Sequence, residues 1–133
     1  LNKGQSSDNP AWDVNNNSAE QELTFRVVSE DKFELRHVLN YPNPFTTHTD
    51  FFFEHNQPGG TFDIQVNIYT ISGKLVKTLY DSQFMDGNRC RAISWDGLDD
   101  YGDKLAKGTY LYRVRVKSQD GQTAETVEKL VIL

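Results

Sequence analysis

Apolar and polar residues alternate along much of this chain, and this alternation predicts a series of short strands. The clearest run of period two extends from Phe62 to Ile68, where every second residue is apolar. Turns rich in glycine, proline and aspartate separate the runs, and no stretch has a helical period. Further strands are predicted at residues 33–39, 49–54, 75–80, 89–95, 110–117 and 123–133. About seven strands spaced roughly 10 residues apart predict an all-β, antiparallel sandwich.

The composition changes near residue 30, and the change predicts two parts. Residues 1–20 are rich in asparagine and serine, and residues 21–29 alternate like a strand. A polar break at Ser29–Lys32 then precedes the first run of the sandwich. We therefore predict a linker with the last strand or strands of a preceding domain at 1–32, and one domain at 33–133.

Charge and composition exclude several classes of function. The chain has 133 residues and a net charge of −5, so nucleic acid is not an expected partner. No apolar run reaches the length of about 18 residues that a membrane span needs. Cys90 is the single cysteine, which leaves no internal disulfide, and it is expected as a buried or half-buried strand residue. No catalytic, phosphate-binding or metal-ligand spacing stands out, so neither enzymatic activity nor a cofactor is expected for this stretch.

Two segments are predicted to form turns that connect and position strands. The first segment ends a strand, because its two prolines lack the N–H that a central strand needs. It consists of Tyr41, Pro42, Asn43, Pro44 and Phe45. The second segment is predicted to form tight turns between two strands, and its marked residues are Trp95, Asp96, Gly97, Asp99, Gly108 and Tyr110. A further turn contains Gly73. The aspartates at 96, 99, 100 and 103 fit tight turns, with a calcium site as the alternative, although their spacing does not match an EF-hand loop.

The aromatic and basic residues allow two interpretations each. Trp95 is expected as a core anchor, with a ligand platform as the alternative. Tyr41, Phe45 and the run Phe51–Phe53 are candidates for a carbohydrate-binding surface, and at least one of the three consecutive phenylalanines must face away from the core. Basic residues alternate along one predicted strand and are expected on a solvated face that pairs with the region of Glu125 and Glu128: Arg113, Arg115 and Lys117.

The three landmark segments, in this order and spacing, resemble the C-terminal sorting domains of type IX secretion substrates. The resemblance rests on Asn40–Phe45, Val66–Val76 and Trp95–Asp99 followed by Gly108–Tyr112, and it covers about residues 34–133. The Trp-Asp-Gly segment is also similar to the immunoglobulin-like domain of flagellar hook-capping proteins. The family implies a seven-stranded, antiparallel immunoglobulin-like β-sandwich.

The family also implies a role and a set of partners. The domain would direct a larger protein through the periplasm to the bacterial outer membrane and cell surface, read by the type IX translocon and an outer-membrane β-barrel shuttle protein such as PorV. The terminal motif is the expected sorting and docking element: Lys129, Leu130, Val131, Ile132 and Leu133. An apolar terminal strand offers an edge that a partner or a second copy can extend. Deleting these five residues is expected to abolish export.

The upstream segments narrow the resemblance to the sortase of the same system. Ala11–Glu20, Leu23–Val28 and Phe53–Gly59 are similar to that subgroup. The parent would then be a gingipain-like cysteine endopeptidase whose active site lies upstream. Two other functions remain open at this point, a cell-surface carbohydrate-binding β-sandwich and a periplasmic assembly scaffold.

Overall fold

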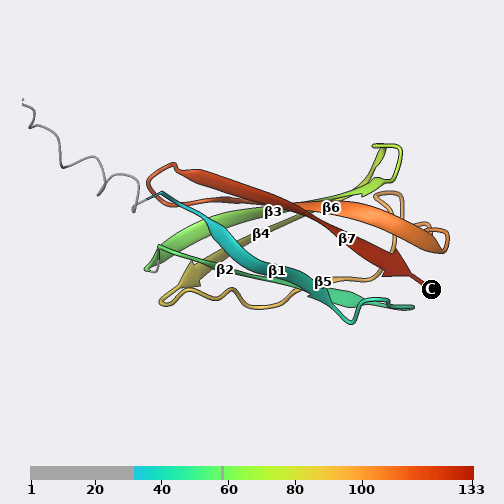
Figure 1. Ribbon diagram of the computed structural model, residues 1–133, viewed down its shortest axis with the longest axis horizontal. Helices are drawn as coiled ribbons and strands as arrows, with labels where there is room; N and C mark the ends of the chain where they lie inside the picture. The colour runs from blue at the N-terminus through green and yellow to red at the C-terminus, as the bar shows by residue number, and fades with distance from the viewer. Residues whose placement is uncertain (1–31, 58) are drawn as a thin grey trace, which may run out of the picture. The chain divides into compact units, whose positions relative to one another are not determined.

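The computed structural model describes residues 32–57 and 59–133, which form seven strands and no helix (Figure 1). The predicted linker and strand before residue 32 lie outside the described residues. Residues Phe33–Leu133 form one compact unit. No helix in this part of the chain is long and apolar enough to cross a membrane. The strands are β1 (Leu35–Tyr41), β2 (Thr49–His55), β3 (Gly60–Thr70), β4 (Leu75–Met85), β5 (Ile93–Trp95), β6 (Gly108–Lys117) and β7 (Thr123–Ile132).

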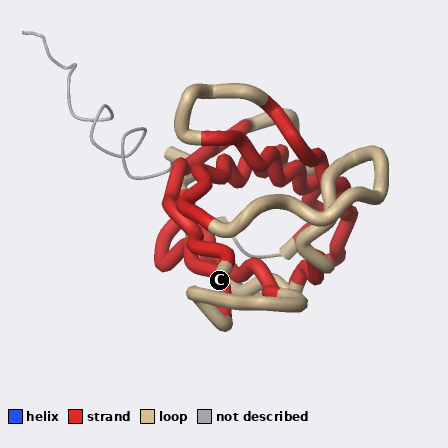
Figure 2. Tube along the Cα trace, turned by 90° about the vertical axis from the view of Figure 1, so that its right-hand side faces the viewer, coloured by secondary structure: helices blue, strands red, loops and turns tan. Residues whose placement is uncertain are grey.

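The strands form two antiparallel sheets packed face to face. One sheet has the order β1-β2-β5 and the other the order β4-β3-β6-β7. Viewed from its end, the domain shows these strands around a common interior (Figure 2). The Tyr110 hydroxyl, near the start of β6, donates a hydrogen bond of 2.8 Å to the Ala106 carbonyl, which is the tyrosine corner of immunoglobulin-like sandwiches. The predicted fold class is therefore confirmed.

Burial follows the predicted alternation closely in β2 and β3. Phe51 and Phe53 are 0% and 1% exposed, and both face the other sheet. Phe52 lies on the outer face opposite Leu39, as expected for three consecutive residues of one strand. The interior is filled by large aromatic and branched side chains that both sheets contribute: Phe51, Phe53, Phe62, Ile64, Val66, Ile68, Trp95, Tyr112, Val114, Val116, Leu130 and Ile132.

Two strand boundaries differ from the prediction. The strand predicted at 75–80 continues to Met85, whereas the strand predicted at 89–95 is regular only from Ile93. The Gln83 amide, 2% exposed, accepts a hydrogen bond from the Arg91 N–H (2.9 Å) and donates one to the Arg91 carbonyl (3.1 Å). Gln83 thus binds both backbone groups of Arg91. Residues 88–90 still pair with β2, because the Asn88 carbonyl accepts from the His55 N–H and the Cys90 N–H donates to the Phe53 carbonyl.

Glycine and proline residues occupy the connections between strands where the backbone adopts uncommon conformations. Gly73, in the turn from β3 to β4, has a φ of 95°, and its N–H donates to the Thr70 carbonyl at 2.9 Å. Gly108 begins β6. Tyr41–Pro42 and Asn43–Pro44 are cis peptide bonds and lie in the connection from β1 to β2.

Candidate functional site

Parts of two landmark segments, around Asn43 and around Trp95, meet the terminal motif at one end of the sandwich. We call this place the terminal corner and define it by Asn43, Phe45, Trp95, Gly97 and the segment Lys129–Leu133. β7 runs along β6 to this end, and the outer strands β1 and β7 lie close together on that side of the domain (Figure 1). The corner therefore joins the two sheets through the terminal strand.

Asn43 holds the terminal strand as a neighbouring strand would. Its side-chain oxygen Oδ1 accepts a hydrogen bond from the Val131 N–H at 3.0 Å, and its Nδ2 donates to the Lys129 carbonyl at 3.4 Å. The backbone of Phe45 continues the pairing in parallel, donating to the Val131 carbonyl (3.1 Å) and accepting from the Leu133 N–H (2.8 Å). The outward backbone groups of β7 are thus satisfied at the end where a partner strand was expected.

The Phe45 side chain fixes this segment to the core beneath it. Its ring meets the Trp95 ring edge-to-face with centroids 5.7 Å apart, and Trp95 stacks on Phe51 at 6.3 Å. Gly97 has a φ of 78°, and a Cβ there would lie 3.4 Å from Phe45 Cε2. Glycine at 97 therefore provides both the backbone turn and the space for the Phe45 ring.

The terminal motif divides into buried and accessible residues. Leu130 and Ile132 are 0% and 4% exposed and belong to the core, whereas Leu133 is 58% exposed and Lys129 is also exposed. Val131 is intermediate. A partner that binds the folded domain can therefore contact Lys129, Leu133 and part of Val131, but not the side chains of Leu130 and Ile132.

The aspartates after Trp95 serve the turn. Asp96 Oδ1 accepts from the Leu98 N–H at 3.1 Å, and Asp99 Oδ1 accepts from the N–H groups of Tyr101 and Asp103 at 2.9 Å each. Asp100 covers the edge of β4, because its N–H donates to the Val76 carbonyl at 3.0 Å. Within residues 32–57 and 59–133, no group of acidic, histidine and cysteine side chains is placed to hold a metal ion. The turn interpretation accounts for these carboxylates.

The aromatic surface proposed for carbohydrate does not exist in the folded domain. Phe45, Phe51 and Phe53 are at most 2% exposed because they form the core under the terminal corner, and Trp95 is 2% exposed. The Trp95 indole N–H donates to the Leu98 carbonyl at 2.9 Å, so the ring is a core anchor. Tyr41 remains exposed, at the end of β1. The prediction that these aromatic residues together form an exposed carbohydrate-binding surface was therefore wrong.

The cysteine and the buried histidine are placed for packing. The Cys90 Sγ accepts a hydrogen bond from the Phe53 N–H at 3.2 Å, and burial raises the pKa of the thiol, which makes it a poor nucleophile. His55 is 2% exposed and packs on Phe62 with ring centroids 4.4 Å apart. Neither residue has the partner that nucleophilic catalysis requires in the described part of the chain.

The predicted basic stripe lies on the outer face of the four-stranded sheet. Arg115 faces Glu125 across the strands, with Arg115 Nε and Glu125 Oε1 3.9 Å apart. Glu128 lies opposite Tyr112 on the other face of β7 and does not pair with the stripe, because it is an odd number of residues away from Glu125. The expected pairing therefore holds for Glu125 alone.

Sequence reasoning missed the roles of two amide side chains. Asn43 was grouped with a turn, and Gln83 was not singled out, yet each replaces part of a strand through its amide group. A signal for Asn43 was present in the sequence. An asparagine between two prolines has neighbours that cannot donate to a ladder, which leaves its side chain as the available pairing group.

Asn43→Ala is expected to loosen the terminal strand without unfolding the domain. The variant loses two hydrogen bonds at an exposed position, so the free energy of unfolding should fall by about 1 kcal/mol. Hydrogen exchange at the Val131 N–H should become faster than in the native chain. Asn43→Asp keeps the acceptor for that N–H and should retain most of the protection. An unchanged exchange rate at the Val131 N–H in Asn43→Ala would show that the Asn43 side chain does not hold the terminal strand.

His55 should make the domain less stable in mild acid. The Gln57 N–H donates to His55 Nδ1 at 3.2 Å, and burial lowers the pKa of the ring below its ordinary value of about 6.5. The unfolded chain therefore binds the proton first as the pH falls. The stability is present above about pH 6.5 and is lost below it, by on the order of 1 kcal/mol per pH unit.

Urea unfolding between pH 5 and pH 8 measures this dependence. His55→Gln should flatten the slope below pH 6.5, whereas His48→Gln, on the exposed connection between β1 and β2, should leave that part of the slope in place. If the stability of His55→Gln still falls below pH 6.5 with the same slope, other titratable groups cause the pH dependence.

Comparisons with known proteins give one informative match. No family model and no curated protein matches the chain. Among solved structures, the crystal structure of dimeric latent PorU from Porphyromonas gingivalis is similar, with 32% identity over 72% of this chain and a TM-score of 0.63. The match covers 9% of the PorU chain, so this chain corresponds to a small part of that protein. A calcium-binding mutant of Bacteroides uniformis β-glucuronidase 2 matches at 12% identity over 74% of this chain and 13% of that one, with a TM-score of 0.47. The second match is too distant to support an argument.

Proposed function

We propose that residues 33–133 are the folded C-terminal sorting domain of a protein secreted through the type IX system. The observation that supports this most is the likeness to PorU at 32% identity over 72% of the chain. It agrees with the resemblance found in the motifs, including the narrower resemblance to the sortase PorU. In this proposal the domain carries no catalytic role, and any peptidase active site lies in another part of the parent.

In this proposal the sorting signal is the folded terminal corner rather than an extended peptide. Asn43 and Phe45 already bind the outward backbone groups of the terminal motif, so a partner has no free ladder to extend there. The translocon and a PorV-like outer-membrane barrel would instead contact the exposed Lys129 and Leu133 on the folded surface. In this proposal the domain acts at the outer membrane and the cell surface, which it reaches through the periplasm.

Self-association through edge strands remains a second part of the proposal. The PorU structure is that of a dimer. In this chain β4 and β7 are the edges of the four-stranded sheet, and β4 is covered at Val76 and Thr78 by Asp100. Arg91 covers the end of β4 at Phe84, and Asn43 and Phe45 cover β7 only from Lys129 onwards. A dimer would therefore use the middle of β4 or the first part of β7.

A secretion assay tests the proposal. The 133-residue chain is fused behind a fluorescent protein with an ordinary export signal and expressed in cells with and without a type IX translocon. Fluorescence at the surface or in the medium, lost without the translocon, is the expected result. Fluorescence retained in the periplasm of competent cells would sink the proposal.

Two exposed substitutions separate the corner surface from the fold. Lys129→Ala with Leu133→Ser removes the accessible side chains and leaves the buried ones, so the melting temperature should change little while export falls strongly. Lys104→Ala, on an exposed loop position, is the matched control and should export normally. Normal export of the double variant would show that the partners do not read this corner.

A further inference from the structure

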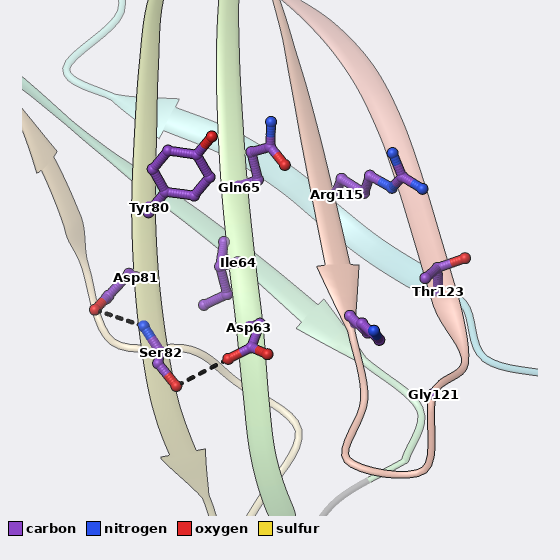
Figure 3. Close-up of a pocket in the computed structure, with 10 residues that line it drawn as sticks. Asp63, Ile64, Gln65, Tyr80, Asp81, Ser82, Arg115, Gly121 and Thr123 are labelled. Atoms are coloured by element: carbon purple, nitrogen blue, oxygen red, sulfur yellow. Dashed lines mark hydrogen bonds between the residues drawn. The ribbon is translucent and has the colours of Figure 1, made fainter.

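The outer face of the four-stranded sheet carries an open hollow of about 920 Å³. Side chains from all four of its strands line the hollow (Figure 3). The pairing register places most of them in two rows across the sheet. One row consists of Tyr80, Gln65 and Arg115, and the next of Ser82, Asp63, Lys117 and Thr123. The hollow lies at the end of β6 and β7 opposite the terminal corner.

The charges that line the hollow balance each other. The carboxylates of Asp63 and Asp81 stand against the basic groups of Arg115 and Lys117. Arg115 Nε already lies 3.9 Å from Glu125 Oε1, and the register sets Asp63 directly opposite Lys117. An anion would meet the two carboxylates and a cation would meet the two basic groups, so the hollow favours an uncharged ligand.

The same side chains leave both donors and acceptors for a ligand. Asp63 Oδ1 accepts from the Ser82 hydroxyl at 3.1 Å, while its other oxygen bonds to none of the described residues. Gln65 Nε2 donates to Asn67 Oδ1 at 3.3 Å, which leaves the Gln65 side-chain oxygen as an acceptor. Lys117 makes no ion pair in the described part of the chain and supplies donors. A ligand must therefore both donate and accept hydrogen bonds, as hydroxyl groups do.

An exposed aromatic ring forms one side of the hollow. Tyr80 is 76% exposed, and Figure 3 shows its ring nearly face-on, with the flat of the ring toward the open side. It stands in one row with Gln65 and Arg115, and two strand spacings, or about 10 Å, separate it from Arg115. A ligand can therefore stack an apolar face on the ring and reach the polar groups beside it.

We propose that this hollow binds a neutral oligosaccharide of β-linked glucose, with a sugar ring stacked on Tyr80 and hydroxyl groups bonded to Gln65 and Asp63. Such a sugar ring carries its hydroxyl groups around the rim, so both of its faces present C–H groups to an aromatic ring. Each hydroxyl both donates and accepts, which matches the mixed polar groups of the two rows. The hollow is separate from the terminal corner, so the proposal does not rest on the sorting role.

Calorimetric titration of the 133-residue chain with three probes tests the proposal. The probes are cellohexaose, a hexamer of galacturonate and a hexapeptide of serine. Cellohexaose should bind, and its Kd should change little with salt because it carries no charge. The galacturonate hexamer should bind at least tenfold more weakly, since it brings carboxylates to Asp63 and Asp81. The serine hexapeptide has hydroxyl groups but no ring face, and should also bind at least tenfold more weakly.

Surface variants identify the residues that bind. Tyr80→Ala should raise the Kd for cellohexaose about tenfold, whereas Tyr80→Phe keeps the ring and should retain most of the affinity. Asp63→Ala removes an acceptor and should raise the Kd severalfold. Two controls lie on the turn after β5, outside the hollow, and should leave the Kd unchanged. Tyr101→Ala removes a side chain that is 90% exposed, and Asp103→Ala removes an exposed carboxylate.

Three results would overturn the proposal. One is the absence of heat with millimolar cellohexaose. Another is an unchanged Kd in Tyr80→Ala, which would place the sugar elsewhere on the domain. The third is equal binding of the serine hexapeptide, which would assign the hollow to peptides. Thermal unfolding of each variant shows whether a lost signal reflects a lost fold.

Discussion

Leu130→Ala should lower the free energy of unfolding by about 2–5 kcal/mol. Leu130 is fully buried in the interior, where the terminal strand lies beside β6 opposite Tyr110. The substitution removes three heavy atoms and leaves a cavity between the two sheets, and the close packing around it cannot collapse fully. A domain of this size has a total stability of roughly 5–15 kcal/mol, so the loss is a large part of it.

Urea unfolding followed by circular dichroism measures this loss. Val127→Ala is the matched control, because Val127 lies on the same strand, is 55% exposed and faces solvent. Its effect should stay within about 0.5 kcal/mol. Equal midpoints for the two variants would mean that the terminal strand does not belong to the core.

This prediction changes how a terminal deletion should be interpreted. Deleting Lys129–Leu133 removes Leu130 and Ile132 from the core together with the backbone pairing to Phe45. The deleted chain should not fold, and failed export would then report the lost fold as much as a lost address. The exposed variants of Lys129 and Leu133 are for this reason the informative test of a docking role.

Trp95→Ala should cost about 3–5 kcal/mol. The Trp95 ring is the support on which both Phe45 and Phe51 rest, and its indole N–H holds the following turn through the Leu98 carbonyl. Its loss should therefore destabilise the core and free the Phe45 segment from below. Guanidinium unfolding gives the size of the effect, and exchange at the Leu133 N–H should show the release of the corner.

Trp95→Phe separates the two contributions of this residue. Phenylalanine keeps an aromatic ring in the core but has no N–H for the Leu98 carbonyl, so it should recover part of the loss. Gly97→Ala provides an independent control on the same corner, because it adds a Cβ near Phe45 at a backbone angle that alanine rarely adopts. A Trp95→Ala variant as stable as the native chain would refute the core role.

The sequence predicted those parts of the fold in which side-chain pattern and burial coincide. β3 has one face in the core, so Phe62, Ile64 and Val66 alternate with polar residues in the sequence itself. In β2 the burial alternates although Phe52 stands between Phe51 and Phe53. β5 and the end of β4 were not predicted correctly. There, Gln83 pairs with the backbone of Arg91, and a polar side chain inside a sandwich leaves no apolar pattern to follow.

The terminal corner was predicted in its parts and not in its assembly. Proline-flanked Asn43, the turn after Trp95 and the motif at Lys129 were each noticed as segments. Their contact depends on the order of strands in the two sheets, which alternation does not specify.

The hydrogen bonds between Asn43 and the terminal strand have a consequence for quality control. They join residues 86 and 88 positions apart, so the corner exists only when nearly the whole domain between them is intact. A copy in which the sandwich has not folded would lack the corner, even with its terminal residues present. In the proposed sorting role, a partner that recognises the corner would bind only the folded domain, so recognition and a test of folding would be one step.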